Sequence, residues 1–122
     1  MTIALWIVAI VLALAFAAAG TVKLTQPKEK LKQQMSWVED VSPNTIRLIG
    51  ATEVLGALGL ILPAVTGIAT VLVPLAAAGL AVVMVLATVV HLRRGERKVL
   101  PVNILLLLLA TFVAVGRFAL PL

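Results

Sequence analysis

Four long apolar runs dominate this chain and constrain its fold more than any other feature. They cover residues 2–24, 46–63, 66–92 and 99–120. A helix needs about 20 mostly apolar residues to cross the hydrocarbon core of a bilayer, so each run is close to the required length. Only 12% of the 122 residues are charged, whereas soluble domains average about 25%. The sequence therefore predicts one domain over residues 1–122, an all-α membrane protein that forms a four-transmembrane-helix bundle in the lipid bilayer.

Three of the runs carry features that bear on where a helix begins or ends. Residues 15–20 read AFAAAG, which is similar to a signal-peptide cleavage site. No Lys or Arg precedes this run, however, and the run is long for the apolar part of a signal peptide, so we interpret it as a retained helix. The second run is short and is expected to end at Pro63. Pro74 in the third run predicts a kink or a broken first turn.

The polar stretch between the first two runs is predicted to hold a short interfacial helix over residues 27–41. Pro27 suits a first helical position, and Pro43 is expected to end the segment. Apolar residues recur there at helical spacing among Lys, Glu and Gln, namely Leu31, Met35 and Val38, with Trp37 beside them. This pattern is typical of a helix that lies in the membrane interface. The alternative is a solvated loop that carries the pattern by chance.

Basic residues gather beside the first and third of the three loops that join the four runs. Those at the first loop are Lys23, Lys28, Lys30, Lys32 and Arg47, and those at the third are Arg93, Arg94, Arg97 and Lys98. Because positively charged loops stay inside the cell, both loops are predicted to be cytoplasmic and both termini to lie outside the cell membrane. The same distribution accounts for the net charge of +5, so no nucleic-acid partner is expected.

Glu53 stands inside the second apolar run, roughly 10 Å below the predicted cytoplasmic interface at 1.5 Å per residue. A carboxylate at that depth costs several kcal/mol unless it is protonated, paired or facing water. Small residues share its helix face, including Gly50 and Gly56, and they allow another helix to approach closely. Glu53 is therefore predicted to point into the bundle, as a member of a buried pair or as a protonation site.

Each predicted span places a polar side chain in the cytoplasmic half of the bundle. The candidates for this polar cluster are Lys23, Arg47, Glu53, His91 and Asn103. Ionisable residues inside the membrane are functional candidates by default. The alternatives are that Lys23, Arg47 and His91 snorkel to the interface, and that a buried pair only sets the helix register. Arg117, the last polar candidate, lies roughly 21 Å along the fourth helix from Asn103 and is expected to anchor the outer interface.

Two absences limit the chemistry that this chain can perform. Cysteine does not occur, so a disulfide framework, a thiolate metal site and thiol redox chemistry are all excluded. Histidine occurs once, which argues against a dedicated zinc or haem site. No metal site is predicted.

Four stretches give the chain a resemblance to a known family. They are AFAAAGTVKL (residues 15–24), IGATEVLGALGLILP (49–63), VVMVLATVVHLRRGE (82–96) and VAVGR (113–117). The chain resembles the DoxX-like family of small four-helix membrane proteins over nearly its whole length. The residues that match are Phe16, Gly20, Lys23, Gly50, Glu53, Gly56, Pro63, His91, Gly116 and Arg117. The fourth span departs from the pattern, because only a leucine run and the Gly-Arg pair match there.

The resemblance implies a role beside redox enzymes. The wider family includes a subunit linked to thiosulfate:quinone oxidoreductase, and other members resemble membrane partners of redox-defence enzymes. A quinone is therefore the cofactor that the resemblance suggests. It also implies that Gly20, Gly50, Gly56 and Pro63 serve helix packing. The related vitamin K epoxide reductase bundle uses cysteines, which this chain lacks, so that chemistry does not carry over.

Three functions follow as hypotheses. The first is an accessory subunit of a membrane redox or respiratory complex, which binds quinone or lipid through the Glu/Lys/His cluster or docks a redox protein. The second is a small proton-coupled transporter of the four-helix type, although its pocket would need aromatic residues and this chain has five in all. The third is an enzyme that acts alone, for which no complete catalytic set is visible. A homo-oligomer is a further expectation, since so small a bundle needs neighbours to enclose a cavity.

Overall fold

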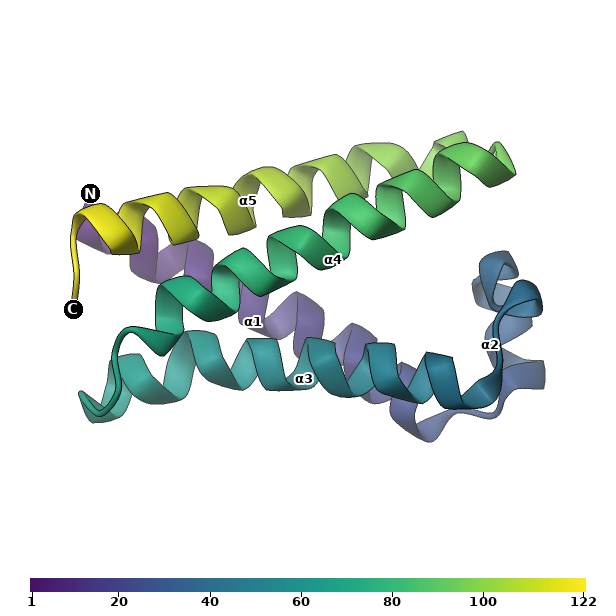
Figure 1. The fold of residues 1–122 in the computed structure, drawn as a ribbon, viewed down its shortest axis with the longest axis horizontal. Helices are drawn as coiled ribbons and strands as arrows, with labels where there is room; N and C mark the ends of the chain where they lie inside the picture. Colours follow the sequence, from purple (N-terminus) through teal and green to yellow (C-terminus); the bar gives the residue numbers. More distant parts are fainter.

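The computed structural model describes all 122 residues and consists of helices joined by short turns (Figure 1). The elements in chain order are α1 (Thr2–Thr25), α2 (Lys28–Gln34), η1 (Ser36–Asp40), α3 (Pro43–Thr66), α4 (Leu72–Arg94), η2 (Arg97–Val99) and α5 (Leu100–Ala119). Helices α1, α3, α4 and α5 are long and apolar enough to cross a membrane. The predicted all-α bundle, with four spans and a short helix between the first two, is confirmed.

The second span, α3, extends beyond the predicted range of 46–63 at both ends. It begins at Pro43 because the Ser42 side chain accepts a hydrogen bond from a first-turn amide at 3.2 Å. Pro43 thus starts a span, at the position that proline favours, in addition to ending the segment before it. At the far end the helix passes Pro63 and stops at Gly67, which has a left-handed φ of 71°. Pro63 is tolerated because it has a helical φ and removes a single backbone hydrogen bond.

The other differences from the predicted ranges also come from local backbone geometry. Helix α4 begins at Leu72 rather than at residue 66, because residues 67–71 form the turn after α3. Pro74 consequently falls in the first turn of α4, where a missing amide costs no helical hydrogen bond. The predicted single helix over residues 27–41 is divided into α2 and η1, because Met35 between them is extended, with φ −133° and ψ 90°.

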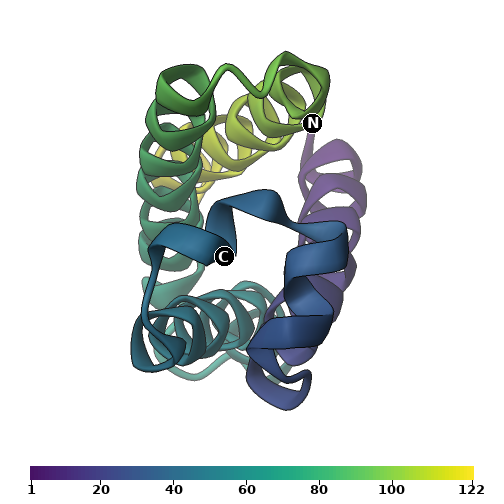
Figure 2. The same cartoon turned by 90° about the vertical axis from the view of Figure 1, so that its right-hand side faces the viewer.

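The four spans form a ring in which each helix packs against two neighbours. Helix α1 contacts α3 and α5, and α4 contacts α3 and α5, with α1 and α3 in the most extensive contact. Toward the end that carries α2, the α4–α5 pair diverges from the α1–α3 pair (Figure 1). Figure 2, viewed from this end, shows the α2–η1 segment lying across the ring. The divergence leaves space for side chains between the helices, and the short segment covers it.

Glycines set the close contact between α1 and α3. A Cβ atom on Gly20 would lie 2.6 Å from the Gly50 carbonyl oxygen, and a Cβ on Gly50 would lie 2.8 Å from the Gly20 carbonyl oxygen. Real Cβ atoms do not approach oxygen this closely, so only glycine fits at both positions. Gly56 similarly meets Leu80 of α4, where a Cβ would lie 2.6 Å from the leucine side chain. These glycines allow the helix backbones to approach as membrane helices with small residues do.

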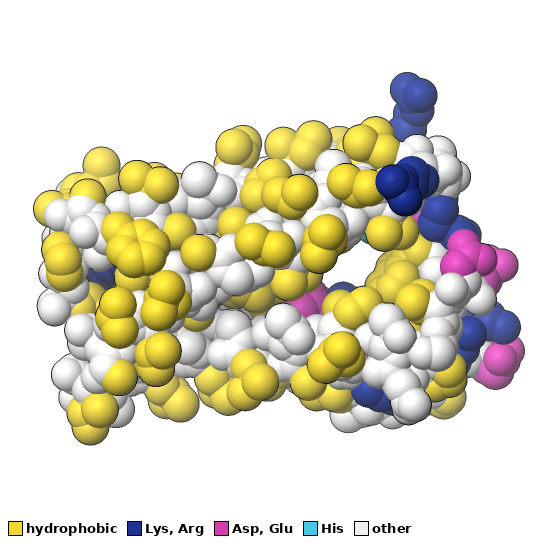
Figure 3. Space-filling model, viewed as in Figure 1, with side chains coloured by type: hydrophobic (Ala, Val, Ile, Leu, Met, Phe, Trp, Pro, Cys, Tyr) yellow, Lys and Arg dark blue, Asp and Glu magenta, His cyan; other side chains and the backbone are white.

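The outer surface of the bundle is apolar along most of its length. Large side chains such as Leu14, Leu55 and Leu86 are more than half exposed, as is expected for surface that contacts lipid. Figure 3 shows the charged side chains gathered at the end that carries α2, with a hollow between α3 and α4 near this end. The chain is therefore a membrane protein with one strongly charged end.

Candidate functional site

An ion pair joins α1 to α3 inside the membrane span. The Lys23 ammonium donates a hydrogen bond to Glu53 Oε1 at 2.5 Å, and the two side chains are only 10% and 3% exposed. Each residue lies three positions after one of the contacting glycines, Gly20 and Gly50. Because residues three apart share a helix face, the close glycine contact brings the two side chains together. The pairing partner that Glu53 requires inside the span is thus Lys23.

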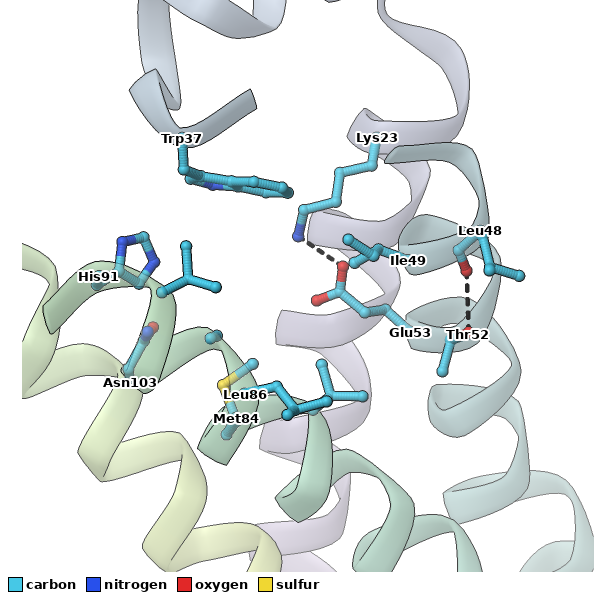
Figure 4. A pocket seen from close by; sticks show the side chains of 13 residues that line it. Lys23, Trp37, Leu48, Ile49, Thr52, Glu53, Met84, Leu86, His91 and Asn103 are labelled. Atoms are coloured by element: carbon cyan, nitrogen blue, oxygen red, sulfur yellow. Dashed lines mark hydrogen bonds and ion pairs between the residues drawn. The ribbon is translucent and has the colours of Figure 1, made fainter. Parts of the chain in front are cut away.

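The ion pair lies on the wall of a cavity of about 320 Å³ (Figure 4). Residues of all four spans and of η1 line this cavity, namely Lys23, Trp37, Leu48, Ile49, Thr52, Glu53, Val83, Met84, Leu86, Ala87, Val90, His91 and Asn103. Figure 4 shows His91 and Asn103 opposite the Lys23–Glu53 pair, with Trp37 across the top. Most of the lining is apolar, and the few polar groups converge from different helices, as in small-molecule binding sites.

Asn103 carries an unsatisfied donor in this cavity. Its side-chain nitrogen, Nδ2, is buried and has no hydrogen-bond partner in the chain. A buried donor without a partner costs about 1–3 kcal/mol, so such groups in native proteins usually have a ligand or a water as partner. Asn103 lies in the first turn of α5, two residues after Pro101, and this position holds the amide within the cavity. A hydrogen-bond acceptor in the cavity would satisfy it.

The η1 segment closes the cavity at the charged end. Trp37 of η1 lies with its ring 6.0 Å from the Lys23 ammonium, within reach of a cation–π interaction. The segment is attached to α2 and α3 through a small apolar cluster of Leu31, Val38 and Ile46, all of them buried. We call η1, residues Ser36–Asp40, the lid.

A polar network fastens the lid to the end of α4. Glu96 Oε1 accepts from Arg94 Nε at 3.0 Å and is 3.1 Å from His91 Nδ1. The Ser36 hydroxyl of the lid donates to the other Glu96 oxygen, and Arg94 pairs with Asp40 at the far end of the lid. The hydrogen bond from Ser36, helped by His91 and Arg94, holds the pKa of Glu96 below its ordinary value. Glu96 is therefore ionised at neutral pH and accepts from the His91 Nδ1–H group.

The backbone that follows α4 explains why Glu96 reaches back to His91. Gly95 adopts a left-handed conformation with φ 71°, and its amide donates to the Leu92 carbonyl at 3.2 Å. The Glu96 amide donates to the His91 carbonyl at 2.9 Å. This pair of hydrogen bonds is the Schellman arrangement that commonly ends helices at glycine. It reverses the chain, so the Glu96 side chain returns to the helix it follows.

Two of the predicted cluster residues lie outside the cavity. Arg47 donates to the carbonyl oxygens of Lys23 and Gln26, the latter at 2.7 Å, and thereby satisfies backbone acceptors at the end of α1. Arg117 lies at the opposite end of the bundle and is only 5% exposed. Its side chain lies over the Trp6 ring, and the expected role as an anchor at the outer interface stays a prediction. Of the six polar candidates, the cavity therefore brings together Lys23, Glu53, His91 and Asn103.

Several residues of this site were not predicted from the sequence. Trp37 was expected on an interfacial helix, without a role at the cavity, and no role was expected for Glu96 or Asp40. The available signal was the Arg-Arg-Gly-Glu stretch, residues 93–96, since a glycine after a helical run often reverses the chain. No group of three His, Cys, Asp or Glu residues lies close enough to hold a metal ion.

Four spans, an internal ion pair and a covered cavity together define a small multi-pass membrane protein with a ligand-sized site. The family model for the DoxX-like family matches residues 7–113, so the chain belongs to the DoxX-like family. This match confirms the resemblance noted in the sequence. No curated protein and no solved structure matches the chain.

Proposed function

We propose that this chain is an accessory subunit of a membrane redox or respiratory complex and that its cavity holds the head group of a quinone. The observation that carries this proposal is the unpartnered Asn103 amide donor, buried in an apolar cavity beside the Lys23–Glu53 pair. The resemblance of the chain to DoxX-like family members that are linked with quinone enzymes also supports the proposal.

The chemistry of the cavity suits a quinone ring. The two carbonyl oxygens of a quinone only accept hydrogen bonds, and the cavity offers donors on opposite walls: the Lys23 ammonium on one and the Asn103 amide on the other (Figure 4). The Trp37 ring provides an aromatic surface at the lid. A cavity of about 320 Å³ is at the lower end of the range for small-molecule sites, which fits a single ring better than a large cofactor.

A quinone also needs room for its isoprenoid tail. Leu48 of α3 and Leu86 and Val90 of α4 line the cavity and are 67%, 61% and 41% exposed on the bundle surface. The cavity wall between α3 and α4 is thus continuous with the surface that contacts lipid, and Figure 3 shows the hollow there. A ligand can pass between these helices with its ring in the cavity and its tail among the lipid chains.

The charged end of the bundle is where we place the protein partner. Lys30, Arg93, Arg97 and Lys98 are exposed at this end, around the lid. Following the rule that positively charged loops stay inside, we place this end in the cytoplasm. A peripheral redox enzyme with an acidic surface would be attracted to it and oriented over the lid.

Native mass spectrometry of gently extracted protein tests the proposal. The probe is a short-chain ubiquinone analogue, added to wild type, Asn103→Ala and Glu53→Gln. Asn44→Ala is the matched control, because Asn44 is the other asparagine of the chain and is exposed at the start of α3. We expect one quinone per chain for wild type and control. Asn103→Ala should weaken binding about tenfold, since a hydrogen bond to a buried amide is lost.

Each of the other outcomes assigns the protein differently. Equal quinone binding by all variants would show that the quinone does not bind in this cavity. A retained phospholipid in place of quinone, lost in Asn103→Ala, would make the site a lipid site. If neither ligand is bound and no redox protein is copurified, the accessory role fails, and proton flux across proteoliposomes then tests the transporter hypothesis. The same spectra report whether the chain is a homo-oligomer.

A further inference from the structure

Arg117 is a buried cation without an acidic partner. Its side chain is 5% exposed, and none of the ion pairs in the chain includes it. The guanidinium lies 5.9 Å from the centre of the Trp6 ring, and Nη1 is 3.4 Å from the Leu120 carbonyl oxygen, a long and weak hydrogen bond. Burying a charge without a counter-charge is costly, so an anion is the expected partner.

The packing of α5 holds Arg117 in this position. A Cβ atom on Gly116 would lie 2.4 Å from the Leu5 side chain, so glycine allows α5 to lie close to α1 here. That close contact places the next residue, Arg117, over the ring of Trp6, which directly follows Leu5 in α1. One face of the Arg117 guanidinium therefore packs against the Trp6 ring.

A second cavity of about 140 Å³ lies beside Arg117, at the end of the bundle away from the lid. It is lined by Thr70, Val71, Pro74, Arg117, Phe118, Pro121 and Leu122. Thr70 contributes a hydroxyl, the only other side-chain donor among these residues. The first backbone amides of α4 are already used, since Leu72 and Val73 donate to the carbonyls of Ala69 and Thr70 at 3.0 and 3.1 Å. The donors available to a ligand are thus side chains.

We propose that this second cavity binds a phosphate group, supplied by the head group of a phospholipid in the adjacent leaflet. The guanidinium presents several N–H donors in a planar fork that matches phosphate oxygens, and the Thr70 hydroxyl adds one more. Arg117 lies two residues before the end of α5, close to where this span is expected to reach the membrane interface. Exposed apolar residues around the cavity, including Val71 and Phe118, face the acyl chains of the same lipid.

The charge distribution supports a ligand from the membrane rather than from the chain. All five acidic residues, Glu29, Glu39, Asp40, Glu53 and Glu96, lie on the lid half of the bundle or in its middle. Nine of the ten Lys and Arg residues also lie on that half, which leaves Arg117 as the single charged side chain at the opposite end. This site is independent of the quinone cavity, and it stands whether or not the proposed function does.

Lipid binding by purified protein tests the site. Wild type, Arg117→Gln, Arg117→Lys and Thr70→Val are extracted in a sugar-based detergent, supplied with phosphatidylglycerol, and measured by native mass spectrometry. Arg97→Gln, an exposed arginine at the lid end, is the matched control. We expect one tightly held phospholipid on wild type and control. Arg117→Gln should bind it about tenfold more weakly, with smaller losses for Arg117→Lys and Thr70→Val.

A second arm identifies the source of the phosphate. Thermal unfolding is measured in lipid-free detergent with and without inorganic phosphate. A rise in Tm of wild type by phosphate alone, absent from Thr70→Val and Arg117→Lys, would support the site but assign it to a free anion. Equal phospholipid retention by wild type, Arg117→Lys and Thr70→Val would overturn the proposal. If Arg117→Gln does not fold, Arg117→Lys and Thr70→Val still test the site, because both keep a positive charge there.

Discussion

At the scale of single residues, Glu53 shows how a carboxylate is accommodated in an apolar helix. Lys23 supplies the opposite charge at 2.5 Å, and both side chains are almost fully buried. Removing one partner of such a pair leaves an uncompensated buried charge, which destabilises the fold strongly. A loss of function in Glu53→Gln would therefore report on packing as well as on binding. Asn103 is the sharper probe of the cavity, because its amide nitrogen has no partner to lose.

We expect the attachment of the lid to depend on pH through Glu96. The pKa of Glu96 lies below its ordinary value of 4.5, chiefly because the Ser36 hydroxyl donates to it. A carboxylate with a lowered pKa contributes stability that is present above its ordinary pKa and is lost as the pH falls through the lowered value. We expect the lid to loosen in acid, starting below about pH 4.5, the ordinary value of the group. Quenching of Trp37 fluorescence by an aqueous quencher measures this loosening. The Trp37→Phe variant gives the fluorescence of Trp6 alone, which is subtracted.

Glu96→Gln provides the comparison for this pH effect. The variant cannot ionise, so the lid should be equally accessible to quencher at neutral and acid pH. Wild type should approach the variant as the pH falls. If quenching in Glu96→Gln rises by the same amount between neutral and acid pH as in wild type, another group controls the lid.

At the scale of helices, the contact between α1 and α3 depends on glycine. We expect Gly20→Ala to push the two helices apart, because its Cβ would lie 2.6 Å from the Gly50 carbonyl oxygen, and to lower stability by about 1–3 kcal/mol. Separation of the helices would also lengthen the Lys23–Glu53 pair one turn away. Thermal unfolding in detergent measures the loss.

Gly79→Ala is the control for this substitution. A Cβ on Gly79 meets nothing within 4 Å, so the change should leave stability within about 0.5 kcal/mol of wild type. Equal effects of the two substitutions would mean that helix propensity, and not the close contact, determines the outcome.

Helix ends show what local sequence can and cannot predict. The Ser-Pro pair at the start of α3 and the Arg-Gly pair at the end of α4 are recognisable signals of helix ends, and both mark helix ends in the structure. The prediction that the second span ends at Pro63 is wrong, because a proline close to the end of a helix removes little hydrogen bonding. The lid, in the second half of residues 27–41, is hydrogen-bonded to α4 more than fifty residues away, and no local pattern contains that contact.

At the scale of the whole molecule, the charged end is predicted to face the cytoplasm. The chain has no cysteine, so single cysteines can be introduced without background. We expect a membrane-impermeant maleimide, applied to intact cells, to label Ile68→Cys in the turn after α3 and to leave Lys30→Cys of α2 unlabelled. Both positions are exposed, so permeabilised cells should label both. The opposite pattern would invert the topology and move the proposed docking surface to the outside.

The sequence by itself determined the number of spans, the membrane environment and the need of Glu53 for a partner. These follow from composition and short-range spacing, because burial in lipid requires long apolar helices and penalises an isolated charge. Only the tertiary structure decided that the partner is Lys23, that Arg47 caps α1, and that Arg117 is buried at the other end. It also decided that the lid covers a cavity. The reason is physical: these outcomes depend on which helices approach closely and where they diverge, and that geometry arises from contacts between residues far apart in the chain.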